Sequence, residues 1–147
     1  MRVLHVHRIR GIGGSERHLL TLLPALGAYG VEPVFLGLDD PAGEPEPFYR
    51  ELGVEAVRLP CPRDLDPGLA RRVRAELRRL RPDVVHTHLV HADVYGALGS
   101  GGVPLVSTKH NDDRFRLGPF RHVERLITRR PRPALATRRA CAARAPA

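Results

Sequence analysis

Short apolar segments alternate along this chain with segments of helical periodicity, and this order limits the possible folds more than any other feature. Five segments are predicted strands: residues 2–7, 32–38, 54–59, 83–88 and 104–108. Helices are predicted over residues 15–26, 48–52, 67–80, 89–98 and 120–130. Strands that alternate with helices form βαβ units, whose parallel strands are joined by right-handed crossovers. We therefore predict an α/β fold with a doubly wound, Rossmann-like parallel sheet.

Residues at the helix ends support this division. Ser15 is expected to cap the first helix, and Glu16 lies in its first turn, where the helix dipole favours a negative charge. Pro24 falls within the same helix and predicts a kink or a break. Asp66 followed by Pro67 is a typical helix start, with a capping carboxylate and a proline in the first helical position.

The length and composition indicate one globular domain. The chain has 147 residues, of which 42% are hydrophobic, and we assign residues 1–130 to the domain. No run approaches the roughly 20 apolar residues that a membrane-spanning helix needs, and no secretory signal is recognisable at the start. Cys61 and Cys141 are too few for a disulfide framework, so we expect a cytoplasmic protein.

Positive charge is concentrated at the end of the chain. The net charge is +8, but six arginines from Arg129 onward, with no acidic residue among them, leave only +2 for everything before. Residues 131–147 are mostly Arg, Ala and Pro, a composition that predicts a disordered tail. Such a tail can contact nucleic-acid phosphates, but no aromatic stacking platform accompanies it, so we do not expect a nucleic-acid partner.

A glycine-rich loop links the first strand to the first helix. Its Gly13–Gly14 pair would let the backbone approach a ligand closely, and the following helix start offers unpaired N–H groups to an anion such as a diphosphate. The spacing matches neither the dinucleotide-binding fingerprint nor a P-loop. The alternative is an ordinary tight turn between a strand and a helix.

Histidines gather at the end of the fourth strand. His86, His88 and His91 have spacings that suit zinc, but Val90 stands where metal-dependent hydrolases of the metallo-β-lactamase kind have an aspartate. We expect packed or hydrogen-bonded histidines and no metal site.

His110 follows the fifth strand. Ligands of open α/β sheets bind beyond the carboxyl ends of the strands, so the glycine loop, His88 and His110 are predicted to lie on one edge. An imidazole at that edge is able to hydrogen-bond a sugar hydroxyl or share charge with a phosphate.

The third helix carries a basic face, formed by Arg71, Arg72, Arg74, Arg78 and Arg79. A basic face of this kind is usually only solvated, but an amphipathic basic helix is also able to lie on an anionic membrane surface. Both interpretations stay open.

Taken in series, four segments resemble the amino-terminal domain of family 4 glycosyltransferases, which have the GT-B fold. They are RVLHV, GIGGSERHLLTLLPAL, PDVVHTHLVHADVYGAL and VPLVSTKHN, and the resemblance covers roughly residues 1–130. It implies the acceptor-side half of an enzyme that transfers a sugar from a nucleotide-sugar with retention of configuration. It also implies no cofactor and no protein-bound metal. The partners it implies are the nucleotide-sugar and a lipid, glycan or small-molecule acceptor.

The resemblance also suggests roles for individual residues. Gly13 and Gly14 correspond to the glycines that approach the donor diphosphate, and His110 to a histidine that contacts the transferred sugar. His88 matches a frequent family histidine without an assigned role. Asn111 stands where the family often has glycine, and it is a candidate acceptor or cleft residue together with His88.

The resemblance stops short of a whole enzyme. The family places a pair of glutamates in a second, donor-binding domain, and no such domain follows residue 130. The sequence from Pro131 onward suggests a frameshifted or truncated end, or a genuine tail. We therefore expect the chain to be inactive alone. A non-catalytic binding module, or a half-enzyme that works with a separate donor-binding domain, is the alternative.

Overall fold

The computed structural model describes residues 1–63 and 66–110. The strands are β1 (Arg2–Ile9), β2 (Glu32–Asp39), β3 (Glu55–Pro60), β4 (Val84–His88) and β5 (Leu105–Thr108). The helices are α1 (Gly14–Leu26), α2 (Glu46–Glu51), α3 (Pro67–Leu80) and α4 (Leu89–Gly99), with a short 3-10 helix, η1 (Gly27–Tyr29), after α1. All five predicted strands and four of the predicted helices are present. The predicted helix 120–130, the tail 131–147 and Asn111 lie outside the described residues.

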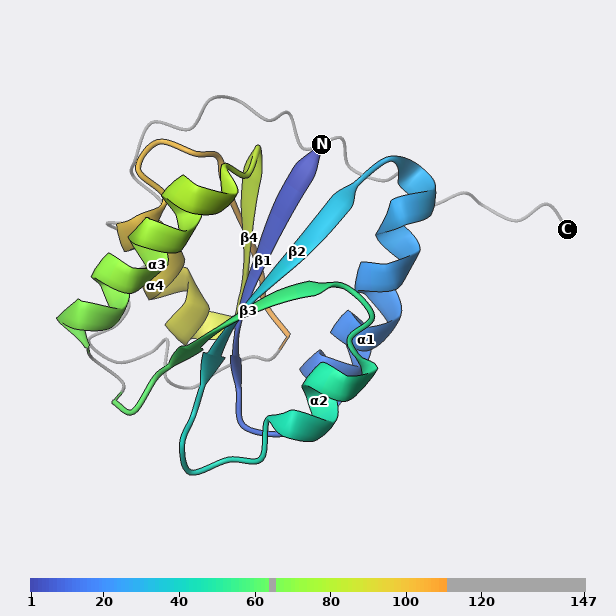
Figure 1. The fold of residues 1–147 in the computed structure, drawn as a ribbon, viewed down its shortest axis with the longest axis horizontal. Helices are drawn as coiled ribbons and strands as arrows, with labels where there is room; N and C mark the ends of the chain where they lie inside the picture. The colour runs from blue at the N-terminus through green and yellow to red at the C-terminus, as the bar shows by residue number, and fades with distance from the viewer. Residues whose placement is uncertain (64–65, 111–147) are drawn as a thin grey trace, which may run out of the picture.

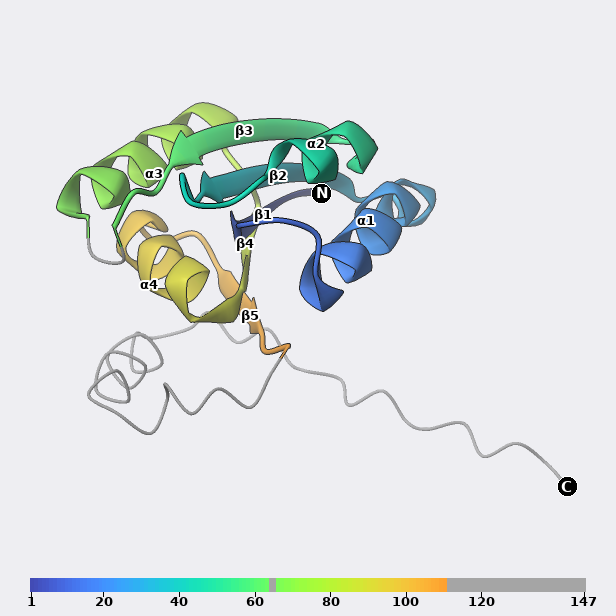
Figure 2. The same ribbon diagram turned by 90° about the horizontal axis from the view of Figure 1, so that it is seen from below.

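The strands form one parallel sheet in the order β3-β2-β1-β4-β5, which confirms the predicted α/β, Rossmann-like fold. The sheet lies between two helical layers (Figures 1 and 2). Helices α1 and α2 cover one face, and α3 and α4 cover the other. The chain winds from β1 outward to β3 and then returns to place β4 on the other side of β1. The reversal between β1 and β4 is the topological switch point of this sheet.

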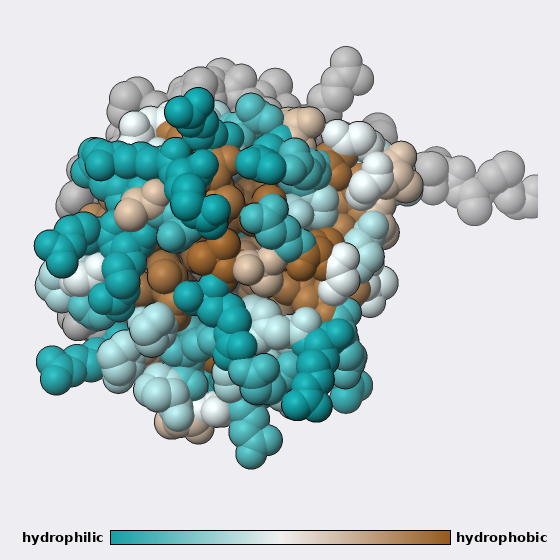
Figure 3. Space-filling view, in the orientation of Figure 1, coloured by the Kyte–Doolittle hydropathy of each residue, from teal (hydrophilic) through white to brown (hydrophobic). Residues whose placement is uncertain are grey.

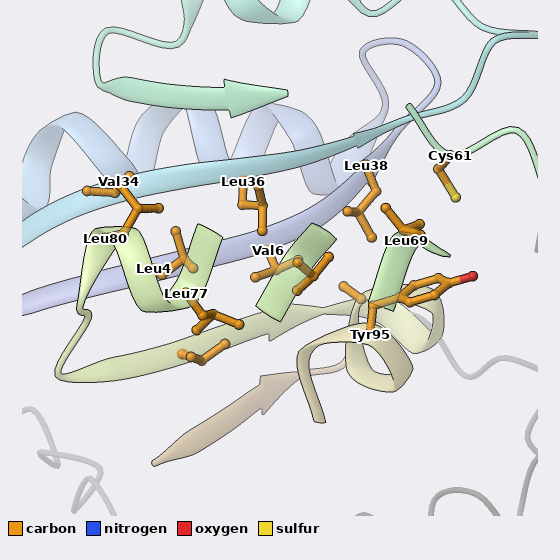
Figure 4. Packing of buried hydrophobic residues seen from close by; sticks show 13 residues of the cluster. Leu4, Val6, Val34, Leu36, Leu38, Cys61, Leu69, Leu77, Leu80 and Tyr95 are labelled. Carbon is orange, nitrogen blue, oxygen red and sulfur yellow. The ribbon is translucent and has the colours of Figure 1, made fainter. Parts of the chain in front are cut away.

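Alternate residues of the central strands enter two separate cores, because successive side chains of a strand point to opposite faces. On the α3–α4 face, Leu4 and Val6 pack with apolar residues of β2, α3 and α4 (Figure 4). On the α1–α2 face, Phe35 packs with Phe48 of α2, their ring centroids 5.1 Å apart. Both clusters consist of fully buried side chains, and they hold the sheet rigid beneath its carboxyl edge.

Helix α1 differs from its prediction at its start and ends at Leu26 as predicted. Its N-cap is Gly13 rather than Ser15, which lies in the first turn. Pro24 does not break the helix, since α1 continues to Leu26. Pro24 stands in the last turn, so its missing N–H costs the helix only one internal hydrogen bond close to its end. Gly30 then closes the segment with φ at 71°, a conformation that favours glycine.

Helix α3 begins as predicted. The Asp66 carboxylate accepts a hydrogen bond of 2.8 Å from the Gly68 N–H, and Pro67 is the first helical residue. Leu69, Val73, Leu77 and Leu80 are buried against the sheet, and arginines fill the outer side. Figure 3 shows hydrophobic residues at the centre of the view, between hydrophilic ones. In the part of the chain that the structure describes, no helix is long and apolar enough to cross a membrane.

Helix α4 approaches β4 closely, and a glycine permits this. A Cβ atom at Gly96 would lie 2.4 Å from Cγ2 of Thr87. We expect Gly96→Ala to lower the free energy of unfolding by about 1–3 kcal/mol, because overpacking displaces the helix. Gly27→Ala is the matched control, since its Cβ would meet nothing within 4 Å. Urea unfolding of both variants measures this, and equal stabilities would show that α4 adjusts freely.

Candidate functional site at the sheet switch point

Four histidines line the switch point on a single face of the sheet. His5 and His7 lie two residues apart on β1, and His86 and His88 lie two residues apart on β4, so each pair shares one face of its strand. The register pairs His5 with His86 and His7 with His88. Their neighbours Leu4 and Val6 enter the opposite core, so the histidines lie on the face that α1 covers. Ligands of open α/β sheets bind at the carboxyl ends of the strands next to such a reversal.

The glycine loop lies over this edge and is held by Glu16. The Glu16 Oε2 atom accepts hydrogen bonds from the Gly13 N–H at 2.9 Å and from the Ser15 hydroxyl at 3.0 Å. The bond to Gly13 is the backward half of a capping box, in which a side chain of the first turn satisfies the N-cap amide. Gly14 forms no hydrogen bond through its N–H with the residues described, and both glycines are exposed.

His7 joins the loop to β4. Its Nε2 lies 2.8 Å from Glu16 Oε1, and its Nδ1 lies 3.1 Å from the carbonyl oxygen of His88. Carboxylate and carbonyl oxygens only accept hydrogen bonds, so each of these two contacts is made by a ring nitrogen that carries its hydrogen. The His7–Glu16 pair is buried. It therefore couples the position of the loop directly to the end of β4.

Three further imidazoles form a chain across the sheet. His5 Nδ1 lies 3.2 Å from His88 Nε2, and His88 Nδ1 lies 3.1 Å from His110 Nε2. His110 also packs against His18 of α1, with ring centroids 5.5 Å apart. His86 is held separately by Thr108, 2.7 Å from its Nε2. The carboxyl ends of β4 and β5 and the start of α1 thus meet in one cluster.

Burial sets the ionisation of this cluster. It lowers the pKa of His5 to about 3, with a smaller effect from His86. It lowers the pKa of His88 to about 2, with the surrounding histidines acting in the same direction. Burial also lowers the pKa values of His86 and His110. Burial alone would raise the pKa of Glu16, but hydrogen bonds from His7, the backbone and Ser15 outweigh it and lower that pKa to about 2.

The turn after His88 is strained. Leu89, the first residue of α4, has φ at 69°, a left-handed conformation that is uncommon for a bulky residue. Strand β4 therefore passes into α4 without a loop, and His88 stays at the end of the strand as the N-cap. The strain is concentrated beside the one buried histidine that contacts both His5 and His110.

The structure brings together four of the five candidate residues. Gly13 and Gly14 form the start of α1, His88 ends β4, and His110 follows β5 at half-buried depth. His110 packs against His18, one turn from the loop, so the glycines and His110 lie at the same edge, as predicted. Asn111 falls outside the described residues. The geometry does not test the chemical roles of these residues, which stay predictions.

His5 and His7 were not among the candidates from the sequence. The signal was present, because histidines two residues apart on a strand share a face, and the chain has two such pairs, in β1 and in β4. That the two strands are neighbours was not readable from the sequence. Glu16 was assigned only to the helix dipole, and its contact with His7 depends on how the start of α1 packs against the end of β1.

Comparison with known proteins identifies the family. The model of Glycosyltransferase Family 4 matches residues 12–145, which includes most of the arginine-rich segment after residue 130. No curated protein sequence is detectably similar to the chain.

Solved structures show the fold. MurG from Acinetobacter baumannii is 15% identical with a TM-score of 0.61, over 87% of this chain and 38% of its own. The lipopolysaccharide outer core galactosyltransferase WaaB is 14% identical with a TM-score of 0.56, over 75% of this chain and 33% of its own. A C-terminal hydrogenase domain from Pyrococcus furiosus is 16% identical with a TM-score of 0.52, over 74% of this chain and 90% of its own.

These likenesses are below 25% identity and establish architecture alone, as the hydrogenase domain illustrates. The chain spans between about a third and two fifths of the two glycosyltransferases. The family match is of a different kind, because it covers most of the sequence. The family match agrees with the parallel sheet, which corresponds to one half of a GT-B fold, and with the glycine loop at the edge of that sheet. The chain is a glycosyltransferase-like domain and belongs to Glycosyltransferase Family 4.

Proposed function

We propose that this domain is the acceptor-side half of a retaining glycosyltransferase that uses a nucleotide-sugar and a lipid, glycan or small-molecule acceptor. The observation that carries the proposal is the exposed, unbonded Gly14 amide at the start of α1, the helix whose His18 packs against His110. A helix N-terminus with free N–H groups stabilises negative charge. The group for which this arrangement is best suited is the leaving diphosphate of the donor.

Glu16 limits which amide performs this role. The Gly13 N–H is already bound to the Glu16 carboxylate, so the diphosphate would meet the Gly14 N–H. A Cβ at Gly13 would lie 3.0 Å from Glu16 Oε2, whereas one at Gly14 would meet nothing within 4 Å. Gly13 is therefore assigned to the shape of the loop. Gly14 leaves open the space beside its own N–H, where the diphosphate would bind.

His110 would contact the transferred sugar. Its Nε2 faces His88, so its other ring nitrogen, Nδ1, is the one available to a sugar hydroxyl. Burial lowers the pKa of His110, which keeps the ring neutral and able to donate or accept a hydrogen bond. His88 would position His110 and would not itself touch the sugar, because it is buried behind it.

A second domain would complete the site. The chain covers 38% of MurG and 33% of WaaB. We propose that the donor's nucleotide is held by another domain, either in a longer chain or in a separate protein, and that this domain alone is inactive. Co-purification with a separately encoded donor-binding domain would favour the half-enzyme over a non-catalytic binding module.

The basic face of α3 is the candidate contact with an anionic membrane. Arg71, Arg74 and Arg78 are exposed, while Arg72 and Arg79 are held by Asp66 and Glu76. We expect sedimentation with phosphatidylglycerol vesicles, weakened by salt and by replacing the three exposed arginines with glutamine. Equal sedimentation with phosphatidylcholine vesicles would contradict an electrostatic contact.

We predict that Gly14→Val weakens binding of a diphosphate at least tenfold, because the valine side chain occupies the space above the amide. Inorganic pyrophosphate is the probe for this chain, and amide chemical shifts in NMR measure its binding at Gly14. Gly11→Val is the matched control, since its Cβ also meets nothing within 4 Å but lies away from the helix start. In an intact family enzyme, unchanged donor affinity of the same substitution in calorimetry would refute the assignment.

A further inference from the structure

We propose that His5, His86 and His88 form a binding site for a divalent transition-metal ion that prefers imidazole ligands, with Zn²⁺ as its representative. One ring nitrogen from each residue lies within 4.8 Å of the other two. The three rings come from two neighbouring strands, so a rigid sheet fixes their backbones. Three histidines are a sufficient ligand set for zinc, which then keeps a fourth position open for water or another ligand.

The spacing of these nitrogens is close to what zinc requires. Zinc–nitrogen bonds of about 2.0–2.1 Å in a tetrahedron place neighbouring nitrogens about 3.3 Å apart. His5 Nδ1 and His88 Nε2 are already 3.2 Å apart. The ring centroids of His86 and His88 are 4.3 Å apart, and those of His5 and His86 are 4.9 Å apart. Forming a tetrahedral site from a set that spans up to 4.8 Å requires the three side chains to move closer together.

His5 is buried, and one of its ring nitrogens already lies beside a ring nitrogen of His88. His5 is only 2% exposed, and its Nε2 has no hydrogen-bond partner among the described residues. The close contact of His5 Nδ1 with His88 Nε2 needs one hydrogen between them, so these two nitrogens cannot both offer lone pairs to each other. A cation bound by these two nitrogens would take the place of that single hydrogen and accept both lone pairs.

Contacts around the ligands favour the same interpretation. Histidine ligands of metals commonly use their other ring nitrogen for a hydrogen bond that fixes the ring. His88 has such a partner in His110, 3.1 Å from its Nδ1, and His86 has one in Thr108, 2.7 Å from its Nε2. Burial keeps the three rings neutral, which is the form that binds metals. His86 is half-buried and so provides the approach from solvent.

The ligand set differs from the one that the sequence suggested. His91 belongs to the same short motif as His86 and His88, but it lies on α4 and is not part of the cluster. The third ligand comes instead from β1, more than 80 residues earlier in the chain. The proposed sugar transfer does not use this ion. Binding of the ion would fix His88 and, through the His88–His110 contact, the orientation of His110, the proposed sugar-contact residue.

The test is direct metal binding by the full 147-residue chain. Calorimetry with Zn²⁺ should show one site, and Co²⁺ should give the intense visible absorption of a tetrahedral ion, while Mg²⁺ gives neither, because it prefers oxygen ligands. His5→Phe keeps the volume of the buried ring, and His86→Ala changes a half-buried one. Each should weaken Zn²⁺ binding by more than about 100-fold, since even the loss of a supporting contact costs 10- to 100-fold.

His91→Ala is the matched control and should bind Zn²⁺ as the unchanged chain does. Far-ultraviolet circular dichroism verifies that each variant is folded, and His86→Ala keeps the test valid if His5→Phe is not. Absence of a Zn²⁺ site in the unchanged chain would overturn the proposal. So would a site that survives both His5→Phe and His86→Ala, or one that His91→Ala abolishes. Because no nucleotide-sugar is involved, these results are independent of the proposed transferase function.

Discussion

Acidification from pH 7 to pH 5 should lower the free energy of unfolding by about 2–4 kcal/mol. His5 and His88 are buried as neutral rings with pKa values of about 3 and about 2, while in the unfolded chain a histidine titrates near 6.5. Below pH 6.5 the unfolded chain therefore binds protons at these two histidines, whereas the folded domain does not. Stability is complete above about pH 6.5 and falls as the pH decreases, by up to about 1.4 kcal/mol per pH unit for each ring.

The histidines around these two rings further disfavour their protonation in the folded domain. His5 faces His86 and His88, and His88 also faces His7 and His110, so a proton on one ring opposes a proton on the next. Glu16 titrates in a different window. Its folded pKa of about 2 lies below the unfolded value of 4.5, so its contribution is present above pH 4.5 and is lost below it. A loss of stability between pH 6.5 and pH 5 therefore reports the histidines.

Urea unfolding at pH 7, 6 and 5 measures this effect, and two variants assign it. His5→Phe should flatten the dependence on pH by removing one buried titrating ring. Thr21→Ser, at an exposed position without an ionisable group, should leave it unchanged. A stability that is constant from pH 7 to pH 5, or an unaltered slope in His5→Phe, would show that the cluster accepts protons without unfolding.

Glu16→Gln should destabilise the domain by about 3 kcal/mol, the second of the large effects. The carboxylate holds His7 at 2.8 Å and also accepts hydrogen bonds from Gly13 and Ser15. An amide has the same shape, but it takes the carboxylate partner away from buried His7, and its NH₂ group cannot accept a hydrogen bond from Gly13. Removing one partner of a buried, hydrogen-bonded pair costs more than the pair contributes, because the other partner stays buried without it.

Glu51→Gln is the matched control for this substitution. Glu51 is exposed at the end of α2, so its replacement should change stability by less than about 0.5 kcal/mol. Chemical denaturation compares the two variants. In Glu16→Gln the amide signals of Gly13 and Gly14 in NMR should also shift, since the loop loses its tie to β1. Equal stability of both variants would mean that His7 finds another partner.

Much of the fold was predictable from local features, because these are properties of short segments. The apolar strands, the helical spacing of Leu69, Val73 and Leu77, and the cap at Asp66 each need only neighbouring residues to form. The same holds for the edge shared by the glycine loop and His110, since the carboxyl ends of parallel strands meet on one side. The error at the start of α1, with the cap predicted at Ser15 and found at Gly13, arose because capping preferences fix a helix start only to within one or two residues. The break considered at Pro24 is absent.

The sequence by itself determined an α/β sheet, a glycine turn before a helix and histidines at strand ends, together with membership of a glycosyltransferase family. Tertiary structure alone decided that β4 returns beside β1. This order places His5 against His88, 83 residues apart, whereas His7 meets Glu16, 9 residues on, through the packing of α1 beside β1. The physical reason is that periodicity fixes which face a side chain occupies, whereas strand order fixes which faces become neighbours. The histidine cluster exists only because the strand order places β1 beside β4.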